Sequence, residues 1–308
     1  MADALQTLVA AELSQPVNPR VGAMAAAIAA RHPGARAVLF YGSCLRETRY
    51  EGLMLDFYLI VADYAAAFAQ KWLATANRLI PPNVFPFEHD GLIAKYAVLS
   101  EKDFARLASG STRNVSVWAR FAQPSRLAWA ADEAARSATT AAVARCAPAL
   151  LAAARPCIAD ALEPLDLWRR AFALTYAAEL RAERKNRAGS VVDADPDRYR
   201  AFTFPALAEA GLAAHLVNGR LVFNHTLSSA ERAAGKRAWA RRSREGKALT
   251  LLRLAKASAT YAGGLDYLAW KISRHSGQPI EIKPWQRKWP IVGALTLLPR
   301  LIVKGAVR

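Results

Sequence analysis

The clearest pattern in the sequence is Phe40-Tyr41-Gly42-Ser43, followed after twelve residues by Asp56-Phe57. Residues 37–41 form a short apolar run that stops at Gly42, and residues 53–61 form a second apolar run with one aspartate in its middle. Short apolar runs bounded by turn residues are typical of buried strands. The sequence therefore predicts a strand that ends in Gly-Ser and a neighbouring strand that carries a carboxylate.

The rest of the pattern extends these two strands into an α+β protein. Residues 92–99 form a third apolar run with Lys95 inside it, and residues 115–121 and 126–130 are short strands or the starts of helices. Asn218-Gly219 between apolar pairs predicts a hairpin. Helices are expected at 21–30, 63–79, 139–155, 165–187, 195–214 and 228–257.

Three regions follow from this pattern. Residues 1–130 are expected to form a small mixed sheet with flanking helices. Residues 131–272, rich in Ala, Leu and Arg, are expected to form a mostly helical, winged-helix-like domain that includes the hairpin. Residues 273–308 are expected to form a basic amphipathic tail.

The composition narrows the range of functions. Of the 308 residues 53% are hydrophobic, which is enough to bury a sizeable core. Lys and Arg number 42 against 25 Asp and Glu, and from residue 231 onward they number 17 against 4. Such a charge favours a polyanionic partner: a nucleotide, a nucleic acid or an anionic membrane surface. The 3 scattered Cys exclude a disulfide scaffold and a Cys-based zinc site, and the 5 His disfavour a His-rich metal site.

The N-terminus carries no targeting pattern. It has no Lys or Arg before Arg20, but it contains Asp3 and Glu12. A secretory signal needs a basic start and a mitochondrial presequence needs early arginines, so neither is expected. No run of 18 apolar residues occurs, so no transmembrane helix is expected either.

The Gly-Ser corner and the two charges within apolar runs suggest phosphate chemistry. Gly42 has no Cβ and lets a triphosphate approach the backbone, while Ser43 offers a hydroxyl and an N–H group to phosphate oxygens. Asp56 can hold Mg²⁺ against those phosphates, and Lys95 can contact triphosphate oxygens. The same residues also fit an ordinary strand-ending turn and a structural Asp56–Lys95 ion pair, since an unpaired charge is costly to bury.

A strand ending in Gly-Ser beside a strand with an aspartate resembles the nucleotidyltransferase fold. Most members of that superfamily carry a second acid two residues after the first, where this chain has Tyr58. Because two metals normally need two carboxylates, either another residue supplies the second one or only one metal is tightly held. Glu88, Asp90 and Glu179 are the candidates, although Asp90 beside Gly91 equally fits a turn.

Four segments, which follow one another along the chain, narrow the resemblance from this superfamily to one family. They are YGSCLRE (41–47), MLDFYLIV (54–61), HDGLIAKYAVLS (89–100) and WARFAQPSRL (118–127). Together they resemble the mitochondrial translocator-assembly-and-maintenance type of phosphatidate cytidylyltransferase, which also lacks the second acid. Further on, LTYAAELR (174–181) is similar to a helix of that family with an acid and an arginine. The resemblance covers the first 130 residues in order and the rest loosely.

The chain also departs from that family. Cys44 stands where the family usually has glycine, and a side chain there would narrow the phosphate loop. The family's His-Tyr stretch has no clear counterpart in residues 72–79. The lack of a mitochondrial presequence and the Ala/Arg-rich composition suggest a bacterial relative.

The resemblance implies a phosphatidate cytidylyltransferase, which converts CTP and phosphatidate into CDP-diacylglycerol and pyrophosphate with Mg²⁺. The implied metal ligands are Asp56 and Glu179, the implied triphosphate contacts are Tyr41, Gly42, Ser43 and Lys95, and the implied catalytic residues are Asp56, Lys95 and Arg120. Glu179 also fits a solvated helix face, because AELRAERKNR offers local charge pairs.

The C-terminal segment suggests where such a lipid substrate would be met. Residues 279–308 interleave aromatic and aliphatic side chains with Lys and Arg, which is typical of an interfacial anchor. The expected location is therefore the cytoplasmic face of a membrane, as a peripheral protein, with no nucleic-acid partner. The tail also fits packing on the protein's own core, and the basic residues 236–247 also fit a nucleic-acid backbone.

Two other functions remain open at this point. One is a nucleotidyltransferase that acts on a soluble acceptor or on RNA. The other is a catalytically degenerate protein that binds a nucleotide or an anionic lipid without turnover, given Tyr58 and Cys44 at the departing positions.

Overall fold

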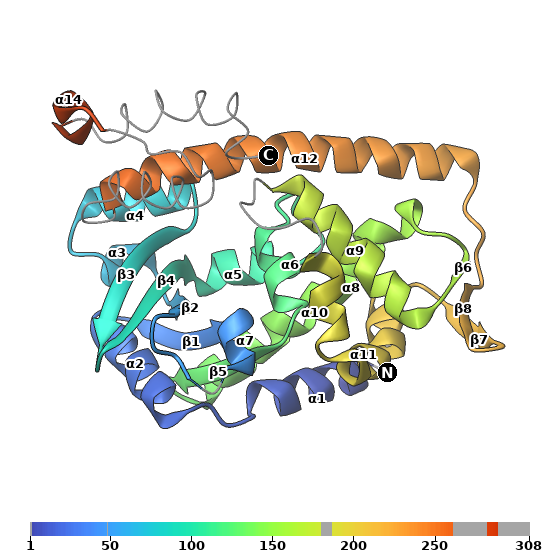
Figure 1. The fold of residues 1–308 in the computed structure, drawn as a ribbon, viewed down its shortest axis with the longest axis horizontal. Coiled ribbons are helices and arrows are strands. Elements are labelled where there is room, and N and C mark those ends of the chain that lie inside the picture. The colour runs from blue at the N-terminus through green and yellow to red at the C-terminus, as the bar shows by residue number, and fades with distance from the viewer. Residues whose placement is uncertain (1, 48, 180–186, 261–281, 289–308) are drawn as a thin grey trace.

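The computed structural model describes residues 2–47, 49–179, 187–260 and 282–288, and it confirms the predicted α+β architecture (Figure 1). A five-stranded sheet with the order β3-β4-β2-β1-β5 forms one half of the molecule. Its strands are β1 Ala35–Tyr41, β2 Met54–Val61, β3 Asn83–His89, β4 Leu92–Ser100 and β5 Ser125–Ala130. Strands β2 and β4 pair in parallel and the other neighbours are antiparallel, so the sheet is mixed as predicted.

Helices surround this sheet and make up most of the second half. Those within the first 130 residues are α1 Ala2–Leu13, α2 Pro19–Ala30, the 3₁₀ helix η1 Ser43–Arg46, α3 Tyr64–Ala67, α4 Lys71–Leu79, α5 Glu101–Leu107 and α6 Ser116–Phe121. Those that follow are α7 Glu133–Ala144, α8 Cys146–Ala154, the 3₁₀ helix η2 Arg155–Cys157, α9 Pro164–Ala178, α10 Arg187–Asp193, α11 Pro196–Glu209, α12 Ser229–Thr260 and α14 Pro284–Lys288.

A small second sheet contains the predicted hairpin. Strands β7 Ala214–Val217 and β8 Arg220–Phe223 pair across Asn218-Gly219, and β6 Ala161–Leu162 joins the other side of β8. Asn218 and Gly219 both have positive φ, which is the geometry of the tight turn that this dipeptide favours.

The large sheet is buried on both faces, because alternate side chains of each strand enter different cores. On one face Phe40, Phe57 and neighbouring strand residues pack with α2, α3 and α4. On the other face, Leu39 and Ile60 share a core with buried residues of α8, α9 and α11. Residues on both sides of the expected domain boundary near residue 130 therefore contribute to one hydrophobic core, and the division itself stays a prediction.

The long basic helix α12 runs along one side of the molecule, from the hairpin end towards β3 and α4 (Figure 1). Its Trp239 packs against Trp118 and donates an indole hydrogen bond of 2.8 Å to the carbonyl oxygen of Ala153. The aromatic side chain within the basic segment 236–247 is therefore in the core, where it is not available for stacking on a nucleobase.

One stretch of the described residues, Glu133–Cys157, has the length and composition of a membrane-crossing helix. It is divided among α7, α8 and η2, and 56% of its most apolar window is buried within the protein. Helix α8 packs against α6, α9 and α11. We therefore find no clear membrane-spanning helix among the described residues. The expected tail, 273–308, lies outside the described residues except at 282–288.

Several predicted elements differ in detail. The helix expected at 63–79 is two helices, because residues 68–70 leave the helical conformation. Strand β3 was not predicted, and residues 115–121, for which strand and helix were both open, form a helix. The helix expected to reach residue 187 ends at Ala178, because Glu179 has an extended backbone with φ −117° and ψ 151°.

A buried ion pair joins the N-terminal helix to the helical half. Arg198 of α11 binds Glu12 of α1 through two nitrogens, and Arg198 also donates a 3.1 Å hydrogen bond to the carbonyl oxygen of Ala122. Only 8% of the Glu12 side chain and 7% of the Arg198 side chain are exposed. The Arg198 guanidinium lies 4.2 Å from the ring centroid of Phe202, so the pair is enclosed by apolar groups.

Breaking this pair is expected to destabilise the fold strongly. Glu12→Gln leaves the Arg198 charge buried without its carboxylate, which typically costs about 3 kcal/mol of unfolding free energy. Urea denaturation measures the loss. Glu133→Gln, which changes a carboxylate that is 83% exposed, is the matched control and should stay within about 0.5 kcal/mol of the parent. Equal stabilities for the two variants would contradict the importance of the buried pair.

Candidate functional site

Strand register brings the predicted site residues together. Tyr41 at the end of β1 pairs with Asp56 of β2, and Asp56 pairs in turn with Lys95 of β4. Residues directly opposite each other on neighbouring strands project from the same face of a sheet. The three side chains thus form one row across the sheet, at the place where the chain leaves β1 through Gly42.

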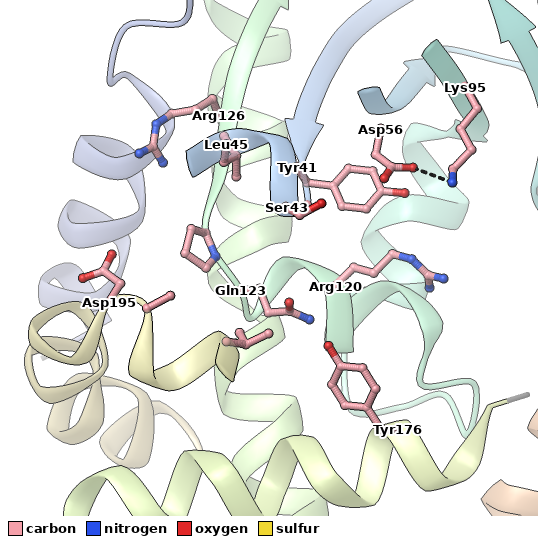
Figure 2. Close-up of a pocket in the computed structure, with 14 residues that line it drawn as sticks. Tyr41, Ser43, Leu45, Asp56, Lys95, Arg120, Gln123, Arg126, Tyr176 and Asp195 are labelled. Carbon is pink, nitrogen blue, oxygen red and sulfur yellow. Dashed lines mark ion pairs between the residues drawn. The ribbon is translucent and has the colours of Figure 1, made fainter. Parts of the chain in front are cut away.

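A cavity of about 260 Å³ opens beside this row. Figure 2 shows Asp56, Lys95 and Arg120 gathered around the Tyr41 ring. The residues that line the cavity are Tyr41, Gly42, Ser43, Leu45, Asp56, Lys95, Arg120, Gln123, Pro124, Arg126, Tyr176, Val191, Ala194 and Asp195. Six of the seven residues predicted from the sequence are among them, and Glu179 is not.

The backbone angles at position 42 and the nearby Asp56 side chain both require a glycine there. Its φ of 95° and ψ of −164° fall in a region that is essentially restricted to glycine. A Cβ added at Gly42 would also lie 3.3 Å from Oδ2 of Asp56, closer than an ordinary contact. The corner therefore places the chain backbone directly against the carboxylate, in addition to leaving room for a ligand.

Gly42→Ala is expected to disturb the corner by both effects. The strained backbone alone typically costs about 1–3 kcal/mol, and the added methyl group pushes on the Asp56 carboxylate. Gly52→Ala is the control, because Gly52 also has positive φ, 75°, but nothing lies within 4 Å of its Cβ position. Melting temperatures should fall further for Gly42→Ala than for Gly52→Ala, and a larger fall for the control would contradict this account.

Asp56 and Lys95 form the ion pair that the sequence left open. The Lys95 Nζ lies 3.1 Å from Oδ1 of Asp56, and the two side chains are 35% and 23% exposed. The pair lies on the cavity wall, so both charges remain accessible to a ligand. A pair with this much exposure contributes only about 1 kcal/mol or less to stability.

Arg120 carries the third charge of the cavity. Its Nη1 donates a 2.5 Å hydrogen bond to the Ser116 carbonyl oxygen and lies 3.6 Å from Oε1 of Glu179. Burial lowers the pKa of Arg120, but the charge of Glu179, together with smaller contributions that include Asp56, outweighs that effect and the pKa is raised overall. The Glu179 side chain, 8% exposed, is therefore a buried partner of Arg120. Its metal-binding role stays a prediction.

Tyr41 contributes a neutral wall between these charges. Burial, and then the nearby Asp56 carboxylate, raises the pKa of its phenol well above the usual value. The phenol therefore stays protonated near neutral pH and can donate a hydrogen bond to an anion in the cavity.

The other acid candidates lie in different surroundings. Asp90 and Gly91, both with positive φ, form the tight turn between β3 and β4, and Asp90 lies 3.4 Å from Arg20. Glu88 is exposed on β3. Tyr58, where the motif resemblance would place a second acid, is buried with its ring centroid 5.4 Å from that of Tyr41.

The Asp56 carboxylate suits a magnesium ion that arrives with its ligand. No group of three or more His, Cys, Asp or Glu side chains suited to a metal occurs in the described part of the chain. Mg²⁺ is usually bound by one or two carboxylates together with substrate phosphates and waters. Asp56 supplies one such carboxylate on the cavity wall, and the Ser43 hydroxyl also lines the cavity.

The structure corrects one expectation about the corner. Cys44 was expected to narrow the phosphate loop, but its side chain is 5% exposed and belongs to the core on the opposite face of the sheet. Its thiol lies 3.6 Å from the carbonyl oxygen of Met54. Cys44 therefore does not line the cavity.

Four polar or charged lining residues were not assigned a role from the sequence. Gln123 and Arg126 follow α6 in the quoted segment WARFAQPSRL, so their proximity to Arg120 was a usable signal. Tyr176 of α9 and Asp195, which caps the N-terminus of α11, come from the helical half. No spacing rule connects those two positions to the sheet.

Comparison with known families and curated proteins finds no match for this chain. The functional argument therefore rests on the chemistry of the cavity, together with the motif resemblance.

A second cavity, of about 160 Å³, adjoins the first and shares Tyr41, Lys95 and Arg120 with it. Its remaining lining residues are Phe57, Tyr58, Pro82, Val84, Ala97, Arg253 and Lys256. Arg253 and Lys256 come from the last turns of α12, where Lys256 donates hydrogen bonds to the carbonyl oxygens of Ile80 and Pro82. Burial, together with the nearby Arg253, lowers the pKa of Lys256 to about 7.

The lowered pKa of Lys256 makes stability depend on pH. In the unfolded chain its pKa is near 10.5, so between about pH 7 and 10.5 the unfolded state binds more protons and this contribution to stability rises with pH. From pH 7 to 9 the wild type is expected to gain about 2 kcal/mol relative to Lys256→Gln. Urea denaturation of both proteins at the two pH values measures this difference. A constant difference would contradict it.

Proposed function

We propose that this protein is a Mg²⁺-dependent nucleotidyltransferase that transfers a cytidylyl group from CTP to the phosphate of phosphatidate. The observation that carries the proposal is the single wall formed by Gly42, Ser43 and Asp56, with Lys95 and Arg120 beside it. The resemblance of the sequence motifs supplies the choice of CTP and phosphatidate. The products are CDP-diacylglycerol and pyrophosphate.

The charges of the cavity suit an acceptor that is itself a phosphate. A phosphate monoester has a second pKa of about 6 and is largely dianionic near pH 7. It needs no general base, so the site has to align it with the α-phosphate and neutralise charge. Asp56 beside Lys95 and Arg120 fits two anionic reactants, and the other carboxylate that lines the cavity, Asp195, caps the N-terminus of α11.

Each of the six lining residues predicted from the sequence then has a role. Gly42 and Ser43 contact the triphosphate, and the Tyr41 phenol donates to it. Asp56 would hold the magnesium ion, which when bound neutralises phosphate charge. Lys95, released from Asp56, and Arg120 would balance the remaining charge as the acceptor oxygen bonds to the α-phosphorus and the bond to pyrophosphate breaks.

Labelled CTP tests this reaction directly. The full chain is incubated with Mg²⁺ and vesicles that contain phosphatidate, and the label is counted in an organic extract. Label on the α-phosphate should enter the lipid, whereas label on the γ-phosphate should remain in water as pyrophosphate. No α-label in the lipid from folded protein would contradict the proposal, and label in added RNA would favour an RNA acceptor instead.

The substrate would require contact with a membrane surface, so we also propose a peripheral location. The basic, aromatic C-terminal segment supports it, because each Lys or Arg near an anionic leaflet contributes about 1 kcal/mol. Flotation with anionic vesicles should recover the full chain and fail for a chain that ends at Arg274. Equal recovery of both would place the lipid contact elsewhere.

A further inference from the structure

The second cavity contains two basic side chains, Arg253 and Lys256, that do not line the first cavity. Two of its cations have carboxylate partners, Lys95 with Asp56 and Arg120 with Glu179. Within the described residues, neither Arg253 nor Lys256 forms an ion pair with a carboxylate, and both donate to backbone carbonyls instead. None of the residues that line this cavity is an acid.

The arrangement of Arg253 leaves one donor for a ligand. Its Nε donates a 2.8 Å hydrogen bond to the carbonyl oxygen of Pro81. Its Nη2 is buried and has no hydrogen-bond partner in the part of the chain that the structure describes. A buried, unpaired guanidinium nitrogen is costly, because it has lost water without gaining an acceptor. An anion in the cavity would supply that acceptor.

Lys256 presents the same requirement. The residue is only 8% exposed, and its ammonium group is held by two backbone carbonyls, which are dipoles rather than charges. Its pKa of about 7 reflects the cost of burying that charge beside Arg253 without an anion. A bound dianion would reverse this cost by Coulomb attraction at short range.

The position of the cavity connects these charges to the reaction site. Tyr58, where related nucleotidyltransferases have a second carboxylate, lines this cavity and not the first one. Two basic side chains from α12 thus lie near Tyr58, the position where a second acid would hold a second metal. Lys95 and Arg120 border both cavities, so ligands in the two cavities would meet across those side chains.

We infer that the cavity formed by Lys95, Arg120, Arg253 and Lys256 is a second phosphate subsite, which binds the phosphate monoester of the acceptor beside the nucleotide. This inference rests on the proposed function for the identity of the acceptor, but the phosphate chemistry follows from the cations alone. The source of the phosphate is either a lipid headgroup or a free phosphate ester, and both present the same dianion.

Lys256→Gln and Arg253→Gln test the subsite, with Lys247→Gln as the control. A glutamine side chain in place of Lys256 would keep N–H donors for the two carbonyls, and Lys247 is an exposed cation on the same helix. At saturating CTP, the two subsite variants should raise the apparent KM for phosphatidate vesicles about tenfold, the value of one charge-assisted hydrogen bond. The KM for CTP should stay within about twofold of the parent. Melting temperatures confirm that each variant is folded.

The outcomes separate this inference from the proposed function. An unchanged KM for phosphatidate would overturn the subsite, because the cations would then bind no substrate. A raised KM for CTP with an unchanged KM for phosphatidate would also overturn it, because the cations would then bind the triphosphate. Inorganic phosphate, titrated without nucleotide by calorimetry, provides an arm that needs no transfer activity. Phosphate binding that is lost in Lys256→Gln, in a protein without transfer, would uphold the subsite for a free phosphate and reject the proposed function. No phosphate binding in a protein without transfer would overturn both.

Discussion

Asp56→Asn is expected to lower the transfer of label from CTP to lipid by about 10²–10³-fold, the usual effect of removing one group that stabilises charge in the transition state. The reason is the position of the carboxylate, on the wall of the cavity and against the Gly42 backbone. The substitution keeps the size of the side chain and removes its charge, so the variant loses the proposed metal ligand without leaving a void.

The stability of the same variant distinguishes the proposal from a purely structural ion pair. The pair with Lys95 is partly exposed, so its loss should cost about 1 kcal/mol or less. Asp197→Asn is the matched control, because that side chain is 91% exposed, and it should keep full activity. Large destabilisation with residual activity in proportion to the folded fraction would favour the structural pair.

Arg120→Gln is expected to have two large effects. It leaves the buried Glu179 carboxylate without the guanidinium that lies 3.6 Å away, which typically costs about 3 kcal/mol of unfolding free energy. It also removes a cation from both cavities, so transfer should fall by about 10²-fold. Denaturation and the lipid-labelling assay measure the two effects separately.

The double variant Arg120→Gln with Glu179→Gln separates stability from chemistry. Removing both charges relieves the buried carboxylate, so most of the lost stability should return. Transfer should stay low, because the phosphate charge is still not balanced. If activity returned together with stability, Arg120 would be a structural residue only, and its assignment to the site would be wrong.

The strands that carry the site were predictable because their signal is local. Each of the runs around Phe40, Asp56 and Lys95 is a short apolar segment, and each forms a strand close to its expected bounds. Even the juxtaposition of Asp56 and Lys95 could be weighed in advance, since a single charge in an apolar strand requires a partner. The hairpin at Asn218-Gly219 was predictable for a similar reason.

The features that the sequence did not predict depend on contacts between residues that are distant in the sequence. Strand β3 contains Pro86 and has a mixed pattern, so only its pairing with β4 establishes it as a strand. Glu179 looked like part of a solvated helix, but the helix ends just before it and its side chain is buried beside Arg120. Arg253 and Lys256 sit in a basic helix, and nothing in their spacing shows that they reach the sheet.

The most direct test of the account is the binding of a CTP analogue whose α,β-bridging oxygen is replaced by methylene, measured by calorimetry with and without Mg²⁺. The account predicts saturable binding that is strengthened by Mg²⁺ in the wild type, with the Mg²⁺ effect lost in Asp56→Asn. Binding that is equally strong without Mg²⁺ and in Asp56→Asn, or no binding at all, would contradict the claim that Gly42, Ser43 and Asp56 form a site for a magnesium-bound nucleoside triphosphate.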